Sequence, residues 1–222
     1  KTGLTIHSLY GQTRRPTPEM LEGVDVLVFD MQDIGARYYT YVSTMAYAME
    51  AAGENGVPFV VLDRPNPIRG DAVQGNVLDP EYSTFVGLYP VPMRHGMTAG
   101  ELARMFVDLT VVPMEGWRRS MTFEETGLPW VAPSPNIPTQ ESALAYPGTC
   151  LFEGTPLSVG RGTERAFQWI GAPWLDGPAL AEALNGYNLE GVSFEAVTFT
   201  PSNAGDRKFE GQEVSGVRLV PS

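Results

Sequence analysis

The stretch "VDVLVFD", residues 24–30, is an apolar run that ends in a carboxylate, and "PFVVLD", residues 58–63, repeats that pattern. Short apolar runs of this kind are typical of buried strands. Between them lies "ARYYTYVSTMAYAMEAAGENG", with apolar residues at helical spacing from Tyr38 to Ala52 and Gly53 available to end a helix. A strand, a helix and a strand in this order imply a right-handed crossover, so the two runs are predicted to be adjacent parallel strands.

The flanking sequence extends this pattern to a domain. "LTIHSLY", residues 4–10, is predicted to be a further strand, and "PTPEMLEG", residues 16–23, a short helix. "TAGELARMFVDL" begins with Thr98 and has Glu101 three residues later, which is the spacing of a capping box at a helix start. We therefore predict a Rossmann-like α/β domain over residues 1–130, with a mainly parallel sheet and helices on both faces.

The second half of the sequence differs in composition. The proline-rich passage 127–148 is predicted to be a structured crossing between domains, because prolines at this density restrict the backbone. A glycine-rich stretch follows, then a predicted helix over 177–188 and a predicted strand over 191–202, which together favour a smaller α+β domain over residues 131–222. Because the sequence opens and closes near strand-like runs, we expect it to be a middle part of a longer protein.

Composition excludes several classes of function. The 222 residues are 43% hydrophobic and 18% charged, which is typical of a globular protein with a sizeable core. A formal net charge of −11 and the absence of any Lys/Arg run argue against a nucleic-acid partner. No apolar run approaches the length of a membrane span, so none is predicted. The single cysteine, Cys150, cannot form an internal disulfide and is expected to be a small core residue.

Polar side chains follow both predicted parallel strands. Asp30 and Asp63 stand at the carboxyl ends of these strands, where open parallel sheets bind ligands. Either aspartate could instead cap a helix or fix a turn. The polar residues beside them are Gln32, Asp33, Arg37, Arg64 and Asn66. Two such loops together favour a shared ligand site.

Other loops add candidates, each with a structural alternative. His95 precedes a predicted helix start and is either a ligand-binding or a structural histidine. Asn136 stands between prolines and is either a rigidly presented amide or a buried turn amide. Glu153, Arg161 and Glu164 share a glycine-rich loop, in which Arg161 could simply pair with a glutamate. Aromatic faces suited to stacking on sugars come from Tyr38, Tyr39, Tyr41, Trp130, Trp169 and Trp174, most of which core packing must also use.

Four other enzyme classes fail on their key residues. A haloacid-dehalogenase-type phosphatase needs Asp-x-Asp after the strand, and here the third position is Gln32. No G-x-G-x-x-G follows the first strand, which argues against a dinucleotide site. The two histidines, His7 and His95, do not stand at zinc-ligand spacing, and no G-x-S-x-G nucleophile elbow occurs.

Six motifs in order carry a family resemblance: "SLYG", "VDVLVFDMQDIGARYYTY", "DRPNP", "FVGLYPVPMRHGMTAGELA", "PSPNIPT" and "YPGTCLFEGTPLSVGRGTERAFQWIGAPW". They resemble the NamZ-type exo-β-N-acetylmuramidases, bacterial glycoside hydrolases once known only as a domain of unknown function. The resemblance implies release of terminal N-acetylmuramic acid from the non-reducing ends of peptidoglycan fragments. It also implies no metal or organic cofactor, a site between two domains, and a secreted or periplasmic location, with a cytoplasmic one left open.

The sequence departs from the family pattern at three places. Family members carry a Pro-Glu-His-Gly segment upstream of "SLYG", so we expect one catalytic carboxylate to lie outside this sequence. Gln74-Gly75 replaces a Glu-Gly pair, and residues 214–216 replace a Cys-Gly-Gly element.

Glycoside hydrolysis uses a carboxylic acid and a second carboxylate or a substrate amide. The resident candidates are Asp30, Asp33, Asp63 and Glu153. The lactyl carboxylate of N-acetylmuramic acid calls for a cation, which Arg37, Arg64, Arg94 or Arg161 could supply. The expected partner is therefore a muropeptide or another peptidoglycan-derived sugar. A non-catalytic sugar-binding domain, an inactive fragment and a different sugar hydrolase stay open as alternatives.

Overall fold

The computed structural model describes residues 3–221, which form two compact units. The N-terminal unit is Lys1–Gly127 and the C-terminal unit is Leu128–Ser222. Within the described residues, no helix is long and apolar enough to cross a membrane.

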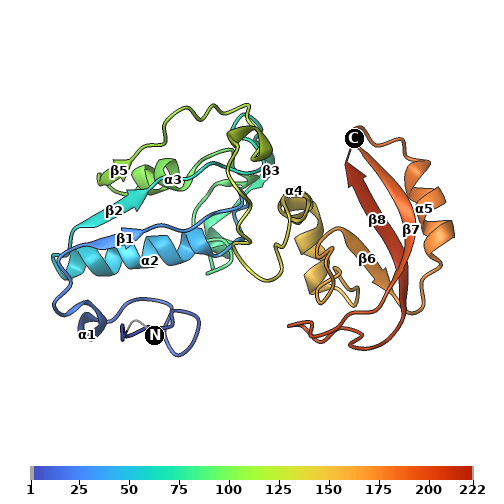
Figure 1. Cartoon of the computed structure of the whole chain (residues 1–222), viewed down its shortest axis with the longest axis horizontal. Helices are drawn as coiled ribbons and strands as arrows, with labels where there is room; N and C mark the ends of the chain where they lie inside the picture. Colours follow the sequence, from blue (N-terminus) through green and yellow to red (C-terminus); the bar gives the residue numbers. More distant parts are fainter. Residues whose placement is uncertain (1–2, 222) are drawn as a thin grey trace. The chain divides into compact units, whose positions relative to one another are not determined.

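The N-terminal unit is built on a parallel three-stranded sheet (Figure 1). Its strands are β1 (Leu27–Phe29), β2 (Phe59–Leu62) and β5 (Thr110–Val112), in the order β1-β2-β5. Phe29 pairs with Val61 across the β1–β2 ladder, which confirms the prediction that the two apolar runs are adjacent and parallel. Their carboxyl ends therefore lie at the same edge of the sheet.

Two helices connect these strands. Helix α2 (Tyr41–Glu54) starts three residues later than predicted, which leaves Tyr38 half-buried in the preceding turn. Helix α3 (Ala99–Phe106) begins at the predicted capping box, in which Thr98 Oγ1 accepts from the Glu101 N–H. Local sequence signals thus located α3 correctly.

Both helices cover the same face of the sheet. The core joins Phe29 and Val61 to α2 and α3 side chains, including Met45. On the opposite face, Val28 is 46% exposed and Val112 is 47% exposed. The prediction of helices on both faces is thus wrong for the described residues. The chain advances in one direction across the sheet, and successive right-handed crossovers then place their helices on one side.

Shorter elements complete the N-terminal unit. They are α1 (Pro18–Leu21), the antiparallel pair β3 (Gln74–Val77) and β4 (Pro92–Arg94), and the 3-10 turns η1 (Pro80–Tyr82) and η2 (Glu124–Thr126). The strand predicted over residues 4–10 does not form, because this segment has no strand pairing and leaves Leu4 and Ile6 exposed.

The C-terminal unit is an α+β arrangement around an antiparallel sheet of order β6-β8-β7 (Figure 1). The strands are β6 (Trp169–Ala172), β7 (Val192–Phe199) and β8 (Val214–Pro221), and α5 (Gly177–Asn185) packs on β7 and β8. The predicted helix and strand are therefore confirmed.

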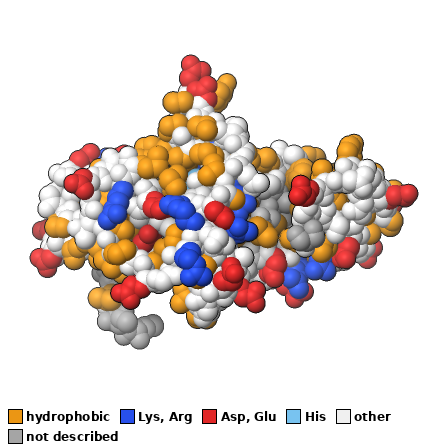
Figure 2. All heavy atoms as spheres, turned by 90° about the horizontal axis from the view of Figure 1, so that it is seen from above, with side chains coloured by type: hydrophobic (Ala, Val, Ile, Leu, Met, Phe, Trp, Pro, Cys, Tyr) orange, Lys and Arg blue, Asp and Glu red, His pale blue; other side chains and the backbone are white. Residues whose placement is uncertain are grey.

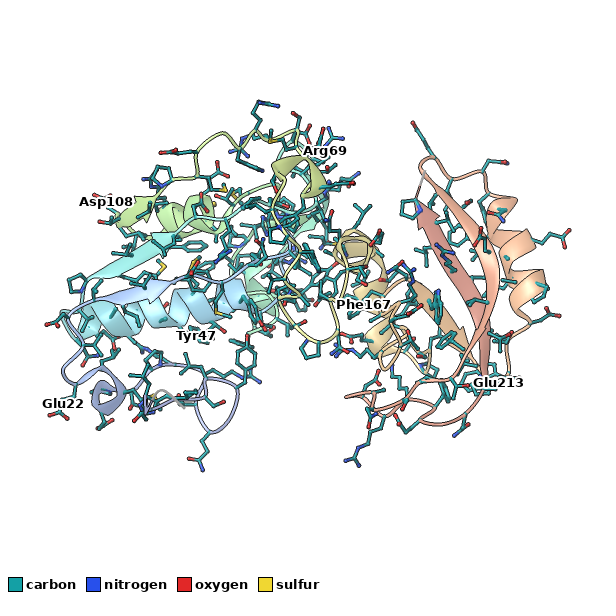
Figure 3. All side chains as sticks on the ribbon, viewed as in Figure 1. Glu22, Tyr47, Arg69, Asp108, Phe167 and Glu213 are labelled. Atoms are coloured by element: carbon teal, nitrogen blue, oxygen red, sulfur yellow. The ribbon has the colours of Figure 1, made fainter. Side chains whose placement is uncertain are left out.

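Helix α4 (Gln140–Thr149) and the 3-10 turn η3 (Cys150–Gly154) were not predicted. Thr139 caps α4 by accepting from the Ser142 N–H, and the helix tolerates Pro147 near its end. Phe167 lies beside α4, with its ring edge-on to Tyr146 (Figure 3).

Candidate functional site

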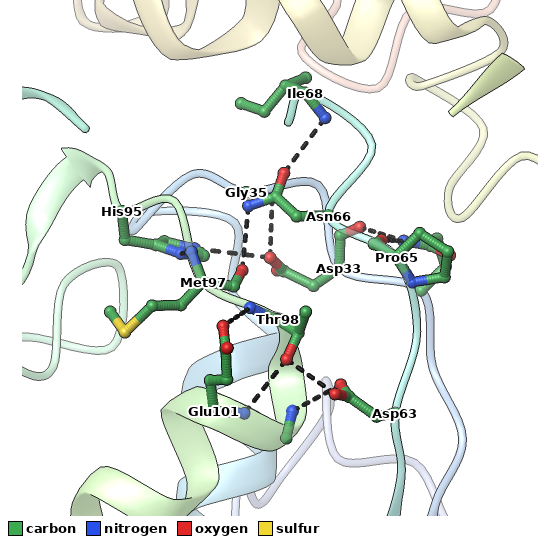
Figure 4. Close-up of polar contacts among 12 residues, drawn as sticks. Asp33, Gly35, Asp63, Pro65, Asn66, Ile68, His95, Met97, Thr98 and Glu101 are labelled. Atoms are coloured by element: carbon green, nitrogen blue, oxygen red, sulfur yellow. Dashed lines mark hydrogen bonds and ion pairs between the residues drawn. The ribbon is translucent and has the colours of Figure 1, made fainter. Parts of the chain in front are cut away.

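Three loops meet at the carboxyl ends of β1 and β2 and the start of α3 (Figure 4). We call residues 30–37, 63–70 and 93–98 the three-loop site. Gln32 Nε2 donates to the Pro65 carbonyl at 2.8 Å, and Asn66 Nδ2 donates to the Met97 carbonyl at 2.9 Å. The His95 N–H donates to the Gly35 carbonyl at 3.3 Å. These hydrogen bonds hold the three loops together.

A buried carboxylate and imidazole lie at the centre of this site. Asp33 Oδ2 accepts from the Gly35 N–H at 2.7 Å and lies 3.5 Å from His95 Nε2. His95 Nδ1 accepts from the Met97 N–H at 3.1 Å, so Nε2 carries the proton of the neutral ring and faces Asp33. Asp33 Oδ1 is buried and has no hydrogen-bond partner among the described residues. Among the described residues His95 Nε2 likewise has no hydrogen-bond partner. Asp33 is therefore held by the Gly35 N–H and lies beside the imidazole without a hydrogen bond to it.

Glycine is required where the first two loops touch. Gly35 has a φ of 81°, and a side chain there would bring its Cβ to 2.5 Å from Asn66 Oδ1. That oxygen accepts from the Ile68 N–H at 3.1 Å and fixes the amide. Asn66 is thus buried and fully engaged in holding the loops.

Asp63 contacts the start of α3. Its carboxylate accepts from Thr98 Oγ1 at 2.8 Å and from the Gly100 N–H at 2.8 Å. It also accepts from the Arg64 N–H at 3.0 Å. These contacts are those of a helix-capping residue, the alternative considered for an aspartate at this position.

Asp30 and Arg64 form an accessible ion pair of the three-loop site, and Arg69, which pairs with Asp71, is also exposed. Arg64 pairs with Asp30 at 2.6 Å, and their side chains are 40% and 50% exposed. Arg37 instead donates to the Asn76 and Val91 carbonyls at 2.8 Å and 2.7 Å. Arg94 donates to the Ile68 carbonyl and to Gln74.

Burial lowers the pKa of both Arg37 and Arg94. These two arginines therefore brace main-chain loops, whereas Arg64 reaches solvent. On the face shown in Figure 2, basic side chains lie among acidic ones and form no continuous basic patch.

The C-terminal unit carries its own polar cluster. Arg161 pairs with Glu153 and lies 5.3 Å from the centre of the Phe167 ring. The Cys150 thiol donates to Glu153 Oε2 at 3.4 Å, and burial raises the pKa of Cys150 to about 12. Cys150 is half-buried. The pairing of Arg161 with a glutamate is the structural alternative considered for this loop.

Comparison with known proteins identifies the family. Residues 1–141 match the model described as "Exo-beta-N-acetylmuramidase NamZ, N-terminal", and residues 144–222 match its C-terminal counterpart. This chain belongs to the NamZ exo-β-N-acetylmuramidase family. The resemblance seen in the sequence is thereby confirmed.

A curated member of the NamZ family gives the scale of the similarity. The chain is 55% identical over 226 residues to the peptidoglycan β-N-acetylmuramidase NamZ of Bacillus subtilis (strain 168). The match covers 99% of this chain and 54% of the relative, so the chain spans about half the relative's length.

Two crystal structures of DUF1343 family proteins from Bacteroides fragilis NCTC 9343 are similar to this NamZ-family chain. One has a TM-score of 0.91 at 43% identity and covers 99% of this chain and 59% of its own. The other has a TM-score of 0.72 at 33% identity and covers 93% and 55%.

The residues predicted from the sequence divide between the two units of this NamZ-family chain. The three-loop site holds Asp30, Gln32, Asp33, Arg37, Asp63, Arg64, Asn66 and His95, with Tyr38 directly after it. Asn136, Glu153, Arg161 and Glu164 belong to the C-terminal unit, where Glu164 is exposed and lies 3.8 Å from Arg165. That both sets line one cleft stays a prediction. Among the described residues, no group of three or more His, Cys, Asp or Glu side chains could hold a metal ion.

Sequence reasoning missed several contributors to these sites. The Met97 N–H fixes the His95 tautomer, and Lys208 donates to three carbonyls around Glu153. A main-chain group carries no residue-specific signal, and Lys208 is 55 residues from Glu153. The role of Lys208 could have been predicted only from a sequence pattern that links the segment around Lys208 to the segment around Glu153.

Proposed function

We propose that this chain is part of an exo-β-N-acetylmuramidase that releases terminal N-acetylmuramic acid from the non-reducing ends of peptidoglycan fragments. The observation that carries the proposal is the 55% identity, over 99% of the chain, to the Bacillus subtilis peptidoglycan β-N-acetylmuramidase. The chain spans 54% of that relative, and the proposal therefore concerns the full-length protein.

The exposed charges of the three-loop site suit the recognition of this sugar. N-acetylmuramic acid carries a lactyl carboxylate, and a guanidinium can bind a carboxylate through two parallel hydrogen bonds. Arg64 is the cation for this role in the three-loop site, because it reaches solvent next to Asp30, whereas Arg37 and Arg94 are occupied by main-chain carbonyls. Arg69 and Arg161 are paired with Asp71 and Glu153. Asp30 holds Arg64 in place and presents the more exposed carboxylate of this loop.

The buried residues behind this pair support it. Asp33, held by the Gly35 N–H and buried beside His95, anchors the loop that carries Asp30. Asp63 ties the loop that carries Arg64 to α3. Asp30 is accordingly the first candidate for contact with the sugar, with Glu153 as a second. The buried residues Asp33 and Asp63 thus hold in place the loops that carry the exposed Asp30 and Arg64.

The decisive assay uses the full-length protein with a chromogenic N-acetyl-β-muramide and with the matching N-acetyl-β-glucosaminide, which lacks the lactyl group. We expect release of the chromophore from the muramide and little from the glucosaminide. Arg64→Ala should lower the ratio of kcat/KM for the muramide to kcat/KM for the glucosaminide by about 10-fold or more. The substitution removes a charge-assisted contact of about 1.5–3 kcal/mol that only the muramide can make.

Two controls complete the assay. Arg37→Ala serves as the matched variant, and any loss there should affect both substrates alike. If the full-length protein binds the muramide without cleaving it, the proposal of an enzyme fails and a sugar-binding function takes its place.

A further inference from the structure

The ammonium group of Lys208 lies in a cage of three main-chain carbonyls. Lys208 Nζ donates to the carbonyls of Glu153 at 2.9 Å, Thr155 at 2.7 Å and Leu157 at 3.0 Å. An ammonium has three N–H donors, so every one of them is used. The carbonyls belong to the segment that carries Glu153, more than fifty residues away in the sequence.

The backbone around Lys208 adopts a disfavoured conformation to reach this cage. Arg207 and Phe209, on either side of it, both have a φ of 55°, in the left-handed region that residues other than glycine rarely adopt. The Glu210 carboxylate helps to hold the segment by accepting from the Asn203 and Ala204 N–H groups at 2.6 Å and 3.0 Å. Such conformations persist where surrounding contacts impose them, and they are frequent at functional sites.

The same segment also contacts the other side of the Glu153–Arg161 pair. The Ser202 N–H donates to the Gly162 carbonyl at 3.0 Å, directly after Arg161. Gly162 has a φ of 79°, and a Cβ there would lie 2.7 Å from the Ser202 carbonyl oxygen. Residues 201–211 therefore hold both chain segments that carry the ion pair, one through Lys208 and one through Ser202.

We infer that Lys208 is a positioning residue whose ammonium occupies a three-carbonyl cation site and thereby fixes the Glu153–Arg161 pair. Main-chain carbonyls are also the ligands that replace the hydration shell of K⁺ in selective channels. Without the lysine side chain, the cage is suited to a small monovalent cation such as ammonium or K⁺. The catalytic consequence rests on the proposed function, in which Glu153 contacts the sugar; the cation site itself does not.

The test compares Lys208→Ala with Lys208→Met in the full-length protein. Alanine empties the cage, whereas methionine fills much of the same space without charge or donors. Both variants should lose about 10–100-fold in kcat/KM on the chromogenic muramide, the usual effect of a small misplacement of reactive groups. Ammonium chloride or KCl should restore activity and raise the melting temperature of Lys208→Ala but not of Lys208→Met, with choline chloride at equal ionic strength as the control.

Each result bears on the inference. Parental activity and melting temperature in Lys208→Ala would overturn it, as would equal recovery in choline chloride or equal recovery of the methionine variant. If the parent protein cleaves no muramide, the proposed function fails, and the cation-dependent melting temperature of Lys208→Ala still tests the cage. If Lys208→Ala is recovered only as unfolded protein, its refolding yield in ammonium chloride against choline chloride gives the same answer.

Discussion

Asp30 and Asp33 stand three residues apart on one loop and have different surroundings. The Asp30 side chain is 50% exposed and pairs with Arg64, whereas the Asp33 side chain is 7% exposed and faces His95. Two chemically identical groups are thus available for different tasks. The exposed carboxylate can reach a substrate, and the buried one can only hold the loop or act through its neighbours.

Asparagine substitutions should separate these tasks, because they remove charge with little change in volume. In the full-length protein, Asp30→Asn should lower kcat/KM by about 100-fold or more, the scale of a general acid/base contribution, with a nearly unchanged melting temperature. Asp33→Asn should lower the free energy of unfolding by about 1–3 kcal/mol, because the Gly35 N–H loses its charged acceptor and the buried carboxylate beside His95 is removed. Steady-state kinetics and urea unfolding of both variants provide the test. If folded Asp30→Asn has the kcat/KM of the parent protein, Asp30 is not part of the active site.

Cys150 should be unreactive in the folded protein. Burial raises its pKa to about 12, so at pH 8 the thiol stays protonated, and only the thiolate reacts. Iodoacetamide should label it about 100-fold or more slowly in the native protein than in urea, a difference set by the thiolate fraction. Because the folded-state pKa is raised above the ordinary value of about 8.5, the associated stability is fully present below that pH and is lost as the pH rises towards 12. Equal labelling rates in both states would contradict this environment.

At the scale of the element, the start of α3 joins stability to the site. Thr98 caps the helix and donates to Asp63, which accepts in turn from the Gly100 N–H. The capping box therefore fixes the helix and also the loop that carries Arg64. A helix start of this kind has both a local and a tertiary function.

Thr98→Ala should cost about 1–2 kcal/mol in the free energy of unfolding, at the upper end for a cap, because the Asp63 contact is lost with it. Thr98→Ser keeps the hydroxyl and is the matched control, expected to retain most of the stability. Urea unfolding followed by circular dichroism measures both. A loss in Thr98→Ser as large as in Thr98→Ala would show that packing of the threonine methyl group, not capping, stabilises this helix start.

At the scale of the whole molecule, the parallel sheet has one covered and one open face. Val28 and Val112 on the open face are about half exposed, at 46% and 47%. Parallel sheets are almost always buried on both faces. The chain spans 54% of its Bacillus subtilis relative, so we expect flanking sequence to cover this face in the full-length protein.

Val28→Asp tests that expectation. In this chain alone the substitution should lower the free energy of unfolding by about 1 kcal/mol or less, the range of strand propensities at a half-exposed position. In the full-length protein it should cost about 3 kcal/mol or more, because it would bury an unpaired charge. Val28→Thr, which keeps the branched shape without a charge, is the control. If Val28→Asp lowers the free energy of unfolding by the same small amount in this chain and in the full-length protein, this face of the sheet stays exposed in both.

The sequence by itself determined those features that depend on local pattern. Apolar runs separated by a helical stretch predicted that "VDVLVFD" and "PFVVLD" are parallel neighbours, and the Thr98–Glu101 spacing located α3. The polar residues after β1 and β2 were recognised as a candidate site, because the carboxyl ends of adjacent parallel strands meet at one edge. Six motifs in order were sufficient to identify the family.

Only the tertiary structure decided what each of those polar residues does. It made Asp63 a cap of α3, placed His95 against Asp33 with its tautomer fixed by Met97, and brought Lys208 to the carbonyls around Glu153. It also placed α2 and α3 on one face of the sheet. The physical reason is that a hydrogen bond to a main-chain atom of a distant segment, like the direction in which strands are added to a sheet, leaves no pattern in the local sequence.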